Sequence, residues 1–191
     1  MAVNRIILNE TSYFGAGAHR MLADEFRGRG YVRAFVVTDK DLIRFGVAGK
    51  VTCVLDEAGI AYEIFSDLKP NPTVKNVQAG VEAFRRSGAD AIVAIGGGSA
   101  MDTAKAVGII AANPAFGDVV SLEGTAPTAN RSVPVFALPT TAGTAAEVTI
   151  NYVITDEANT KKMVCVDPKD IPAVAIIDAE LMAAMPRGLT A

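Results

Sequence analysis

The chain has 191 residues, half of them hydrophobic, and a mean hydropathy of +0.30, so it has enough apolar material for one large domain or two small ones. Its formal net charge is −3 and it has no basic cluster, which argues against a nucleic-acid partner. No apolar run approaches the roughly 18 residues of a membrane span, and the N-terminus lacks the apolar core of a signal peptide. Cys53 and Cys165 are expected to be buried, reduced thiols of a cytoplasmic protein.

The first third of the chain predicts two strands and two helices. Residues 6–8 are apolar and predict a short strand, which either pairs with a second chain or lies at the edge of a sheet. A short helix follows, in which His19 is expected to be a surface residue. Residues 34–37 predict a second, buried strand that ends just before Asp39. Apolar side chains at near-helical spacing then predict one helix over residues 43–55.

Residues 61–65 predict a third strand. The loop after it contains two prolines and ends at Thr73, whose hydroxyl is suited to cap the next helix. From residue 74 to residue 84, apolar side chains recur at intervals of three and four. This spacing predicts a helix with one face toward the core.

The stretch that follows is the most informative part of the sequence. Residues 91–95 are all apolar and predict a strand buried on both faces, and three glycines follow at 96–98. Ser99 is expected to cap the next helix, with Asp102 completing a variant of the capping box. Such a turn directs unpaired N–H groups and the positive end of the helix dipole at one point, where a phosphate can bind. The turn can instead serve only to join strand and helix, although one glycine would suffice for that.

Two further strands are predicted at residues 133–138 and 174–178, and residues 151–155 and 162–166 predict a β-hairpin. The predicted strands are continuous apolar runs that alternate with helices. This pattern is typical of an α/β fold with a Rossmann-like, mostly parallel sheet and helices on both faces, here with an added β-hairpin. Ligands of such sheets bind at the carboxyl ends of the strands.

Polar residues at these predicted strand ends are therefore binding candidates. The usual dinucleotide fingerprint places an acidic residue after the glycines, whereas here Asp39 precedes them. Asp39 either accepts hydrogen bonds from an adenine ribose and repels a 2′-phosphate, which would favour NAD over NADP, or it simply caps the helix at Lys40. Thr140, Thr141 and Thr144 either bind phosphate or ribose, or satisfy the backbone of their own loop.

Other polar residues also have two interpretations. Asp102 is either a helix cap or part of the site, and Lys162 is either a solvated strand residue or part of the site. Asp178 lies at another predicted strand end and is a further candidate. His19 is the only histidine, so it cannot form a metal site or a catalytic pair with a second histidine.

Two long motifs in the correct order closely resemble the iron-containing (group III) alcohol dehydrogenases. They are GGGSAMDTAK at residues 96–105 and LPTTAGTAAEV at residues 138–148, and PNPT at residues 70–73 fits the same family. The resemblance covers essentially the whole chain. Further segments resemble the members that act on 1,2-propanediol and lactaldehyde, and these lie at residues 7–11, 121–124, 148–156 and 164–168.

The resemblance implies that residues 1–191 form an NAD-binding α/β domain. It implies that the glycine turn and Ser99 hold the pyrophosphate, that Asp39 binds the adenosine ribose, and that Asn151 and Lys162 lie near the nicotinamide half. Leu181 and Met185 would wall the adenine. The complete implied set of cofactor-binding residues is Asp39, Asn71, Gly96, Gly97, Gly98, Ser99, Asp102, Thr140, Thr141, Thr144, Asn151, Lys162, Leu181 and Met185.

The resemblance also implies a metal that this chain is not expected to hold. In the family, a second, all-helical domain supplies one aspartate and three histidines to Fe²⁺ or sometimes Zn²⁺, which polarises the alcohol oxygen while hydride passes to NAD⁺. The family signature runs through Pro186, and the chain ends at Ala191, before the expected first metal ligand. We therefore expect no metal-binding or catalytic residue in this chain, and no metal-dependent turnover by it alone.

The sequence thus predicts the NAD-binding half of an iron-dependent alcohol dehydrogenase that interconverts 1,2-propanediol and lactaldehyde by hydride transfer. Two alternatives stay open, a related dehydrogenase for glycerol or another primary alcohol and a non-catalytic NAD-binding module. Dehydroquinate synthase shares the general fold but fits the threonine loop poorly. The expected partners are NAD(H), a small alcohol or aldehyde and a second copy of the chain, in the cytoplasm, with no nucleic acid and no membrane.

Overall fold

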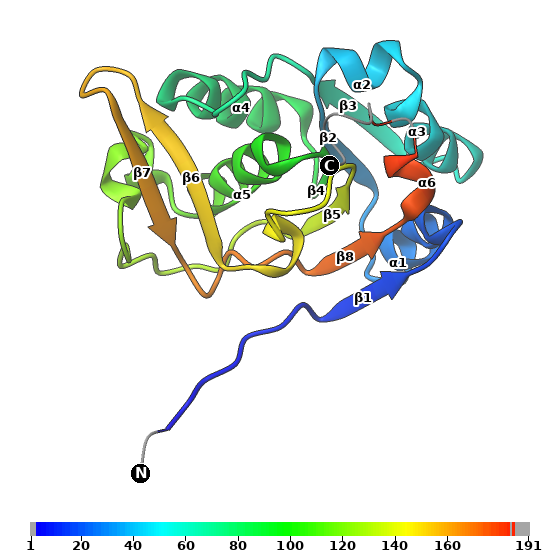
Figure 1. Ribbon diagram of the computed structural model, residues 1–191, viewed down its shortest axis with the longest axis horizontal. Helices are drawn as coiled ribbons and strands as arrows, with labels where there is room; N and C mark the ends of the chain where they lie inside the picture. The colour runs from blue at the N-terminus through cyan, green and yellow to red at the C-terminus, as the bar shows by residue number, and fades with distance from the viewer. Residues whose placement is uncertain (1–2, 184, 186–191) are drawn as a thin grey trace.

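A computed structural model describes residues 3–183 and residue 185. In this part of the chain, six parallel strands form one sheet in the order β1-β8-β5-β4-β2-β3, and β6 and β7 form a separate antiparallel pair (Figure 1). The predicted α/β class, with a parallel sheet and a hairpin, is therefore confirmed. The strands are β1 (Thr11–Phe14), β2 (Arg33–Val37), β3 (Ala61–Phe65), β4 (Ala91–Gly96), β5 (Val135–Pro139), β6 (Asn151–Asp156), β7 (Lys161–Val166) and β8 (Val174–Ile177).

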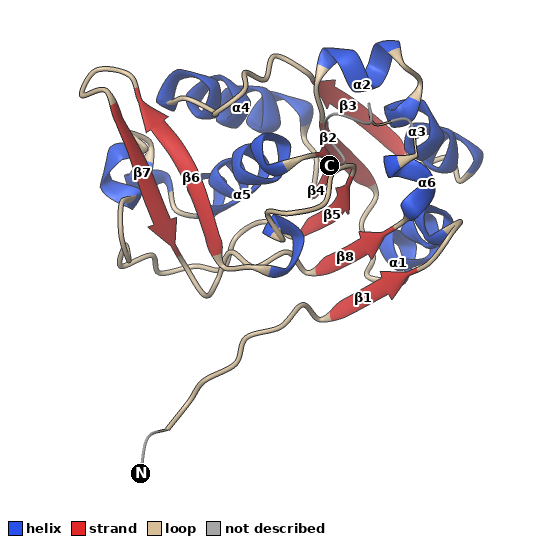
Figure 2. Ribbon diagram, viewed as in Figure 1, coloured by secondary structure: helices blue, strands red, loops and turns tan. Residues whose placement is uncertain are grey.

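Helices cover both faces of the parallel sheet (Figure 2). The α-helices are α1 (Leu22–Gly28), α2 (Lys40–Arg44), α3 (Val47–Glu57), α4 (Val74–Ser87), α5 (Gly98–Ala112) and α6 (Ala179–Met182), and the short 3-10 helices are η1 (Ala18–Met21), η2 (Pro114–Phe116), η3 (Val120–Leu122) and η4 (Ala146–Val148). No helix of the described part is long and apolar enough to cross a membrane.

Neighbouring residues of each central strand point to opposite faces and enter two separate cores. In β2, Phe35 and Val37 pack with α4, α5 and the hairpin, whereas Ala34 and Val36 pack with α1 and α3. All six residues of β4 are buried. Burial on both faces explains why the strands are continuous apolar runs in the sequence.

The strand order creates a crevice between β2 and β4. These two strands are neighbours in the sheet, but the chain after β2 runs to α3 on one face and the chain after β4 runs to α5 on the other. Their carboxyl-end loops therefore separate. Such a topological switch point is where doubly wound sheets bind ligands.

Several helix ends are as predicted. Thr73 caps α4, its side chain accepting from the backbone of Asn76 in a capping box, and Gly88 ends the helix in the left-handed conformation with φ 64°. The predicted single helix over residues 43–55 is wrong, because Gly46, with φ 74°, separates α2 from α3. This left-handed turn needs a glycine, and it reorients the chain between the two helices.

The prediction that residues 6–8 form an edge strand of this sheet is also wrong, whereas their pairing with a second chain stays a prediction. The first strand is β1, which pairs with β8 from Thr11 onward. Residues 3–8 form an extended arm that leaves the sheet (Figure 1), and Ile6 is 81% exposed. An apolar run alone does not define a strand, because the strand forms only where a partner backbone supplies hydrogen bonds.

The predicted cap at Ser99 is wrong as well. The N-cap of α5 is Gly97, and Ser99 lies in its first turn. Asp102 therefore forms no capping box, and its carboxylate instead accepts from the backbone amide of Val153. The glycine turn is tighter than the sequence suggested, so the helix begins two residues earlier.

Two predictions of burial are wrong. His19 is buried rather than on the surface, because η1 packs it against Asp178 at the end of β8. Cys53 is exposed on α3, whereas Cys165 is buried as predicted, and both thiols are free. Position 53 lies on the outer side of α3, between the buried positions Val51 and Leu55.

Candidate functional site

The glycine turn between β4 and α5 has almost no space for side chains. Gly96 has φ +154°, and a Cβ there would lie 2.6 Å from the Cβ of Ala100. A Cβ on Gly97 would lie 2.9 Å from Thr141 Oγ1. These contacts explain why the turn needs more than one glycine, and the turn begins α5 at the carboxyl edge of the sheet, where the first amides of a helix can bind an anion.

The threonine loop after β5 lies directly beside this turn. The backbone amide of Thr140 donates to the carbonyl oxygen of Gly96 at 3.0 Å, and Thr140 is buried. A Cβ on Gly98 would lie 3.1 Å from the methyl group of Thr144. Two segments more than forty residues apart in sequence therefore form one continuous surface.

A third segment closes the site from the side of α4. Asn71 has φ 57°, a left-handed conformation that asparagine tolerates better than most residues. Its backbone amide donates to Ser99 Oγ at 3.3 Å, and its side-chain oxygen accepts from Lys162 Nζ at 2.9 Å. Lys162 is exposed on β7 and links the hairpin to the loop beside the glycine turn, and its role in the site stays a prediction.

The hairpin supplies the remaining wall. Asp102 Oδ2 accepts from the amide of Val153 at 3.1 Å, and the amide of Thr155 donates to the carbonyl oxygen of Pro72 at 2.7 Å. A pocket of about 250 Å³ lies between these segments. It is lined by Asn71, Pro72, Gly98, Ser99, Asp102, Thr144, Val153 and Thr155.

Burial shifts the pKa values of two ionisable side chains at this pocket, Asp102 and Lys105. Burial raises the pKa of Asp102 to about 6, although the Val153 amide and the nearby Lys105 ammonium both act to lower it. Burial lowers the pKa of Lys105, against the attraction of Asp170 and Asp102. The pocket thus combines helix amides and hydroxyls, which suit an anion, with a carboxylate that is protonated more readily than usual.

Asp39 follows β2, the strand next to β4, on the other side of the switch-point crevice. Its Oδ1 accepts from the amide of Leu42 at 2.8 Å and caps α2, as one of the two interpretations predicted. Leu42 lies 3.6 Å from the position of a Cβ on Gly96, so α2 begins beside the glycine turn. The cap uses one carboxylate oxygen, which leaves the other able to accept a hydrogen bond.

The structure brings together only part of the predicted set. Gly98, Ser99, Asp102, Asn71 and Thr144 line one pocket, whereas Leu181 is buried in the core with α1 and α3. The roles of Leu181 and of Met185, in a bend after α6, stay predictions. The cofactor-binding roles of the other residues in the predicted set also stay predictions.

Sequence reasoning missed the two hairpin residues Val153 and Thr155. Along β6, buried residues alternate with more exposed ones, and Val153 and Thr155 are both half-buried. These two side chains therefore lie on the same face of the strand. The predicted strand at residues 151–155 already implied that alternate residues share a face. The sequence analysis also missed Lys105, because no pattern in the neighbouring residues indicates that this lysine is buried.

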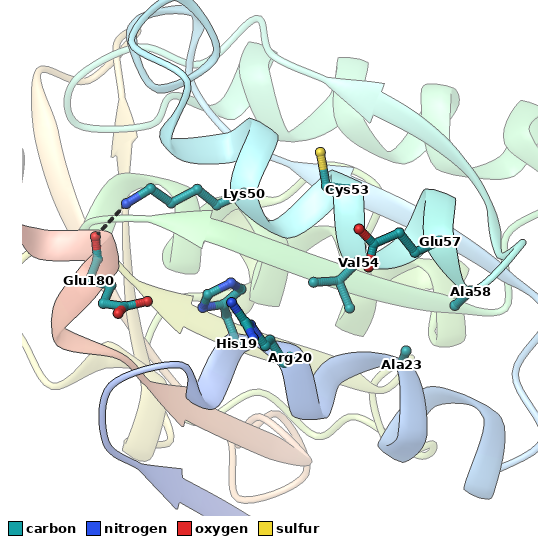
Figure 3. A pocket seen from close by; sticks show the side chains of 9 residues that line it. All are labelled: His19, Arg20, Ala23, Lys50, Cys53, Val54, Glu57, Ala58 and Glu180. Carbon is teal, nitrogen blue, oxygen red and sulfur yellow. Dashed lines mark hydrogen bonds between the residues drawn. The ribbon is translucent and has the colours of Figure 1, made fainter.

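A second, larger groove of about 670 Å³ lies between α1, α3 and α6 (Figure 3). None of the implied cofactor-binding residues lines it. Lys50 donates to the backbone oxygen of Glu180 across one end. Its lining residues are His19, Arg20, Ala23, Lys50, Cys53, Val54, Glu57, Ala58 and Glu180.

This groove contains the one group of three metal-binding side chains found among the described residues. His19, Asp178 and Glu180 each offer a ligand atom, and these atoms lie within 4.8 Å of one another. However, the carboxylate of Asp178 already accepts from the Nδ1 and the amide of His19 and from the amide of Glu180. Two of the three side chains, His19 and Asp178, are thus already hydrogen-bonded to each other, and the side chain of Glu180 is exposed.

Comparison with known proteins places these features in a family. The family model described as iron-containing alcohol dehydrogenase matches residues 9–179. Lactaldehyde reductase of Escherichia coli strain K12 is 58% identical over 188 residues, covering 98% of this chain and 49% of the relative. The chain spans about half the length of the curated relatives it matches.

Solved structures agree with this comparison. A 1,3-propanediol oxidoreductase superposes with a TM-score of 0.94 at 37% identity, covering 100% of this chain and 49% of that one. Sulfoacetaldehyde reductase from Bifidobacterium kashiwanohense, solved in complex with NAD⁺, superposes with a TM-score of 0.87 at 32% identity, covering 99% and 49%.

Proposed function

Because the chain belongs to the iron-containing alcohol dehydrogenase family, we propose that these 191 residues form the NAD-binding part of a dehydrogenase. The observation that carries the proposal is the pocket at the start of α5, where a side-chain-free turn meets a threonine loop and Asn71. Helix amides and hydroxyls at this place suit a pyrophosphate. The NAD⁺ complex of one structural neighbour supports the choice of cofactor.

The cofactor would lie across the switch-point crevice. Gly97, Gly98 and Ser99 would donate to the pyrophosphate from the first turn of α5. Asp39, on the other side of the crevice, would accept from the adenosine ribose with the carboxylate oxygen that α2 does not use. Its negative charge would repel a 2′-phosphate, so we propose a preference for NAD over NADP.

The nicotinamide half would lie toward the hairpin. The proposed contacts Asn151 and Lys162 belong to β6 and β7, and the Lys162 ammonium donates to the side-chain oxygen of Asn71. Thr140, Thr141 and Thr144 form the floor beside the glycine turn. In this proposal the pocket would bind and orient the cofactor, and we assign no catalytic residue within it.

The substrate proposal rests on sequence similarity. The 58% identity to a lactaldehyde reductase over 98% of the chain supports a small hydroxyaldehyde and the corresponding diol, with 1,2-propanediol and lactaldehyde as the proposed pair. Relatives named for other alcohols are less similar, at 41% identity for a methanol dehydrogenase and 38% for a 1,3-propanediol dehydrogenase. We propose that these residues alone do not oxidise the alcohol, since the chain spans about half the length of the dehydrogenases it matches.

The direct test is a calorimetric titration of the chain with NAD⁺ and, separately, with NADP⁺. We expect saturable binding of NAD⁺ and at least tenfold weaker binding of NADP⁺, a difference of about 1.4 kcal/mol. Absence of binding to either nucleotide would contradict the proposal. Oxidation of 1,2-propanediol by this chain on addition of Fe²⁺ would contradict the proposed division between cofactor binding and catalysis.

We also propose a homodimer formed through the N-terminal arm. Val3, Ile6 and Leu8 are 96%, 81% and 73% exposed, and β1 is the edge strand next to the arm (Figure 1). Apolar side chains beside an open strand edge favour pairing with another chain. Light scattering is expected to give a dimer mass for the wild type and a monomer mass for Ile6→Asp/Leu8→Asp, and a dimer of that variant would contradict this route.

The cellular location is a further proposal. Two free thiols, one of them exposed, suit the reducing cytoplasm better than an oxidising compartment.

A further inference from the structure

A lysine is buried behind the wall of the candidate cofactor pocket. Lys105 lies on α5, about two turns after the glycine turn, and has no exposed surface. Its Nζ donates to the carbonyl oxygen of Thr149 at 2.7 Å and to that of Asn151 at 3.0 Å. Because burying an ammonium group costs free energy, the packing of α5 alone does not explain a lysine at this position.

A second charged side chain of α5 continues this pattern. Asp102 accepts from the amide of Val153. Thr149, Asn151 and Val153 are alternate residues of the segment that enters β6, so their backbone groups point to the same side. Along this edge, Lys105 and Asp102 supply the hydrogen bonds that a neighbouring strand would otherwise supply.

Asp170 lies beside the same part of α5, because Ser132 packs against Gly108 of this helix and the Ser132 amide donates to the carbonyl oxygen of Lys169 at 3.2 Å. It has no exposed surface, and among the described residues neither of its carboxylate oxygens has a hydrogen-bond partner. Burial raises its pKa well above the usual value, and the attraction of the Lys105 ammonium acts to lower it. Asp170 in turn opposes the lowering of the Lys105 pKa by burial. Each group therefore supports the charged form of the other.

We propose that Lys105 is a positioning residue of the cofactor site and that Asp170 is its buried counter-charge. Lys105 holds the backbone of residues 149–151, and this fixes Val153 relative to the amides of Gly98 and Ser99 across the pocket. The inference rests on the proposed function. It adds a residue that touches neither pocket nor cofactor but sets the width of the site.

The test compares Lys105→Met, Asp170→Asn and the double variant in the 191-residue chain. Lys105→Met should lower the melting temperature, because it leaves a buried carboxylate uncompensated, and the double variant should recover much of that loss. NAD⁺ affinity should nevertheless stay about tenfold or more below wild type in the double variant, because the backbone bonds remain lost. Lys75→Met, which removes an exposed charge from α4, is the control and should change neither quantity.

Recovery of both stability and NAD⁺ affinity in the double variant would overturn the proposal, because Lys105 would then serve only to neutralise Asp170. Amide hydrogen exchange gives a second measurement that needs no cofactor. The Val153 amide should exchange faster in the double variant while β4 is unchanged, and equal exchange at Val153 would also overturn the proposal. Faster exchange in a chain whose wild type binds no NAD⁺ would support the positioning role and reject the proposed function.

Discussion

The imidazole of His19 and the carboxylate of Asp178, 159 residues apart in sequence, are joined by a 2.5 Å hydrogen bond between Nδ1 and Oδ2. The backbone amide of His19 donates to the same oxygen at 3.0 Å. The other oxygen of Asp178 caps α6 through the amide of Glu180. One buried carboxylate thus fixes the chain after β1, the end of β8 and the start of α6.

Removal of the His19 imidazole should destabilise the protein. His19→Ala leaves the buried Asp178 with fewer donors, so we expect the free energy of unfolding to fall by about 1–3 kcal/mol in a denaturant titration. Arg20→Ala, at the neighbouring exposed position of η1, is the control and should change it by less than about 0.5 kcal/mol. Equal effects of the two substitutions would show that the hydrogen bond contributes nothing.

Asp178 should also contribute to acid unfolding. Burial alone would raise its pKa, but the hydrogen bonds from His19 and from the Glu180 amide outweigh this and hold the pKa below its ordinary value of 3.8. The carboxylate of Asp178 therefore binds a proton more tightly in the unfolded chain than in the folded protein. Its contribution to stability is present above pH 3.8 and is lost as the pH falls through the pKa of Asp178 in the folded protein. Melting temperatures below about pH 5 should fall less steeply for Asp178→Asn than for the wild type.

Asp39 offers a test of cofactor choice that separates its charge from its cap. Asparagine caps helices as well as aspartate, so Asp39→Asn should keep the bond to Leu42 and change the free energy of unfolding by less than about 0.5 kcal/mol. Loss of the charge should raise the ratio of NADP⁺ to NAD⁺ affinity about tenfold, measured by calorimetry. A ratio that does not change would leave Asp39 with the role of a helix cap only.

The close approach at the glycine turn predicts the effect of a single methyl group. In Gly97→Ala the added Cβ would lie 2.9 Å from Thr141 Oγ1, so the threonine loop must shift away from α5. NAD⁺ affinity should fall about tenfold or more. Gly49→Ala is the matched control, since a Cβ there meets nothing within 4 Å and alanine favours the helix. An unchanged affinity in Gly97→Ala would argue against a phosphate at this turn.

Asp102 should make stability depend on pH in the opposite direction from Asp178. Its pKa is raised from 3.8 to about 6, chiefly by burial, so the folded protein holds this proton more tightly than the unfolded chain does. Its contribution to stability is complete below pH 3.8 and is lost as the pH rises through about 6. Asp102→Asn retains an acceptor for Val153, so its melting temperature should rise relative to wild type between pH 4 and pH 7. A constant difference across this range would contradict the shifted pKa.

Much of the fold was predictable because its signals are local. Residues 91–95 read as a strand buried on both faces and are one, and Thr73 read as a helix cap and is one. The predicted hairpin at 151–155 and 162–166 also formed. The errors at residues 6–8 and at Ser99 arose where a local pattern fits more than one backbone path.

The sequence by itself determined the class of fold, the glycine turn and the threonine loop, because periodicity, chain flexibility and hydroxyl content are properties of neighbouring residues. Tertiary structure alone decided which distant groups meet. Packing buries Lys105 beneath the backbone of Thr149, for which the sequence gives no local signal, and η1 brings His19, which was predicted to be a surface residue, to Asp178. Such contacts depend on how elements pack, and a polar side chain is buried only where that packing supplies a hydrogen-bond partner.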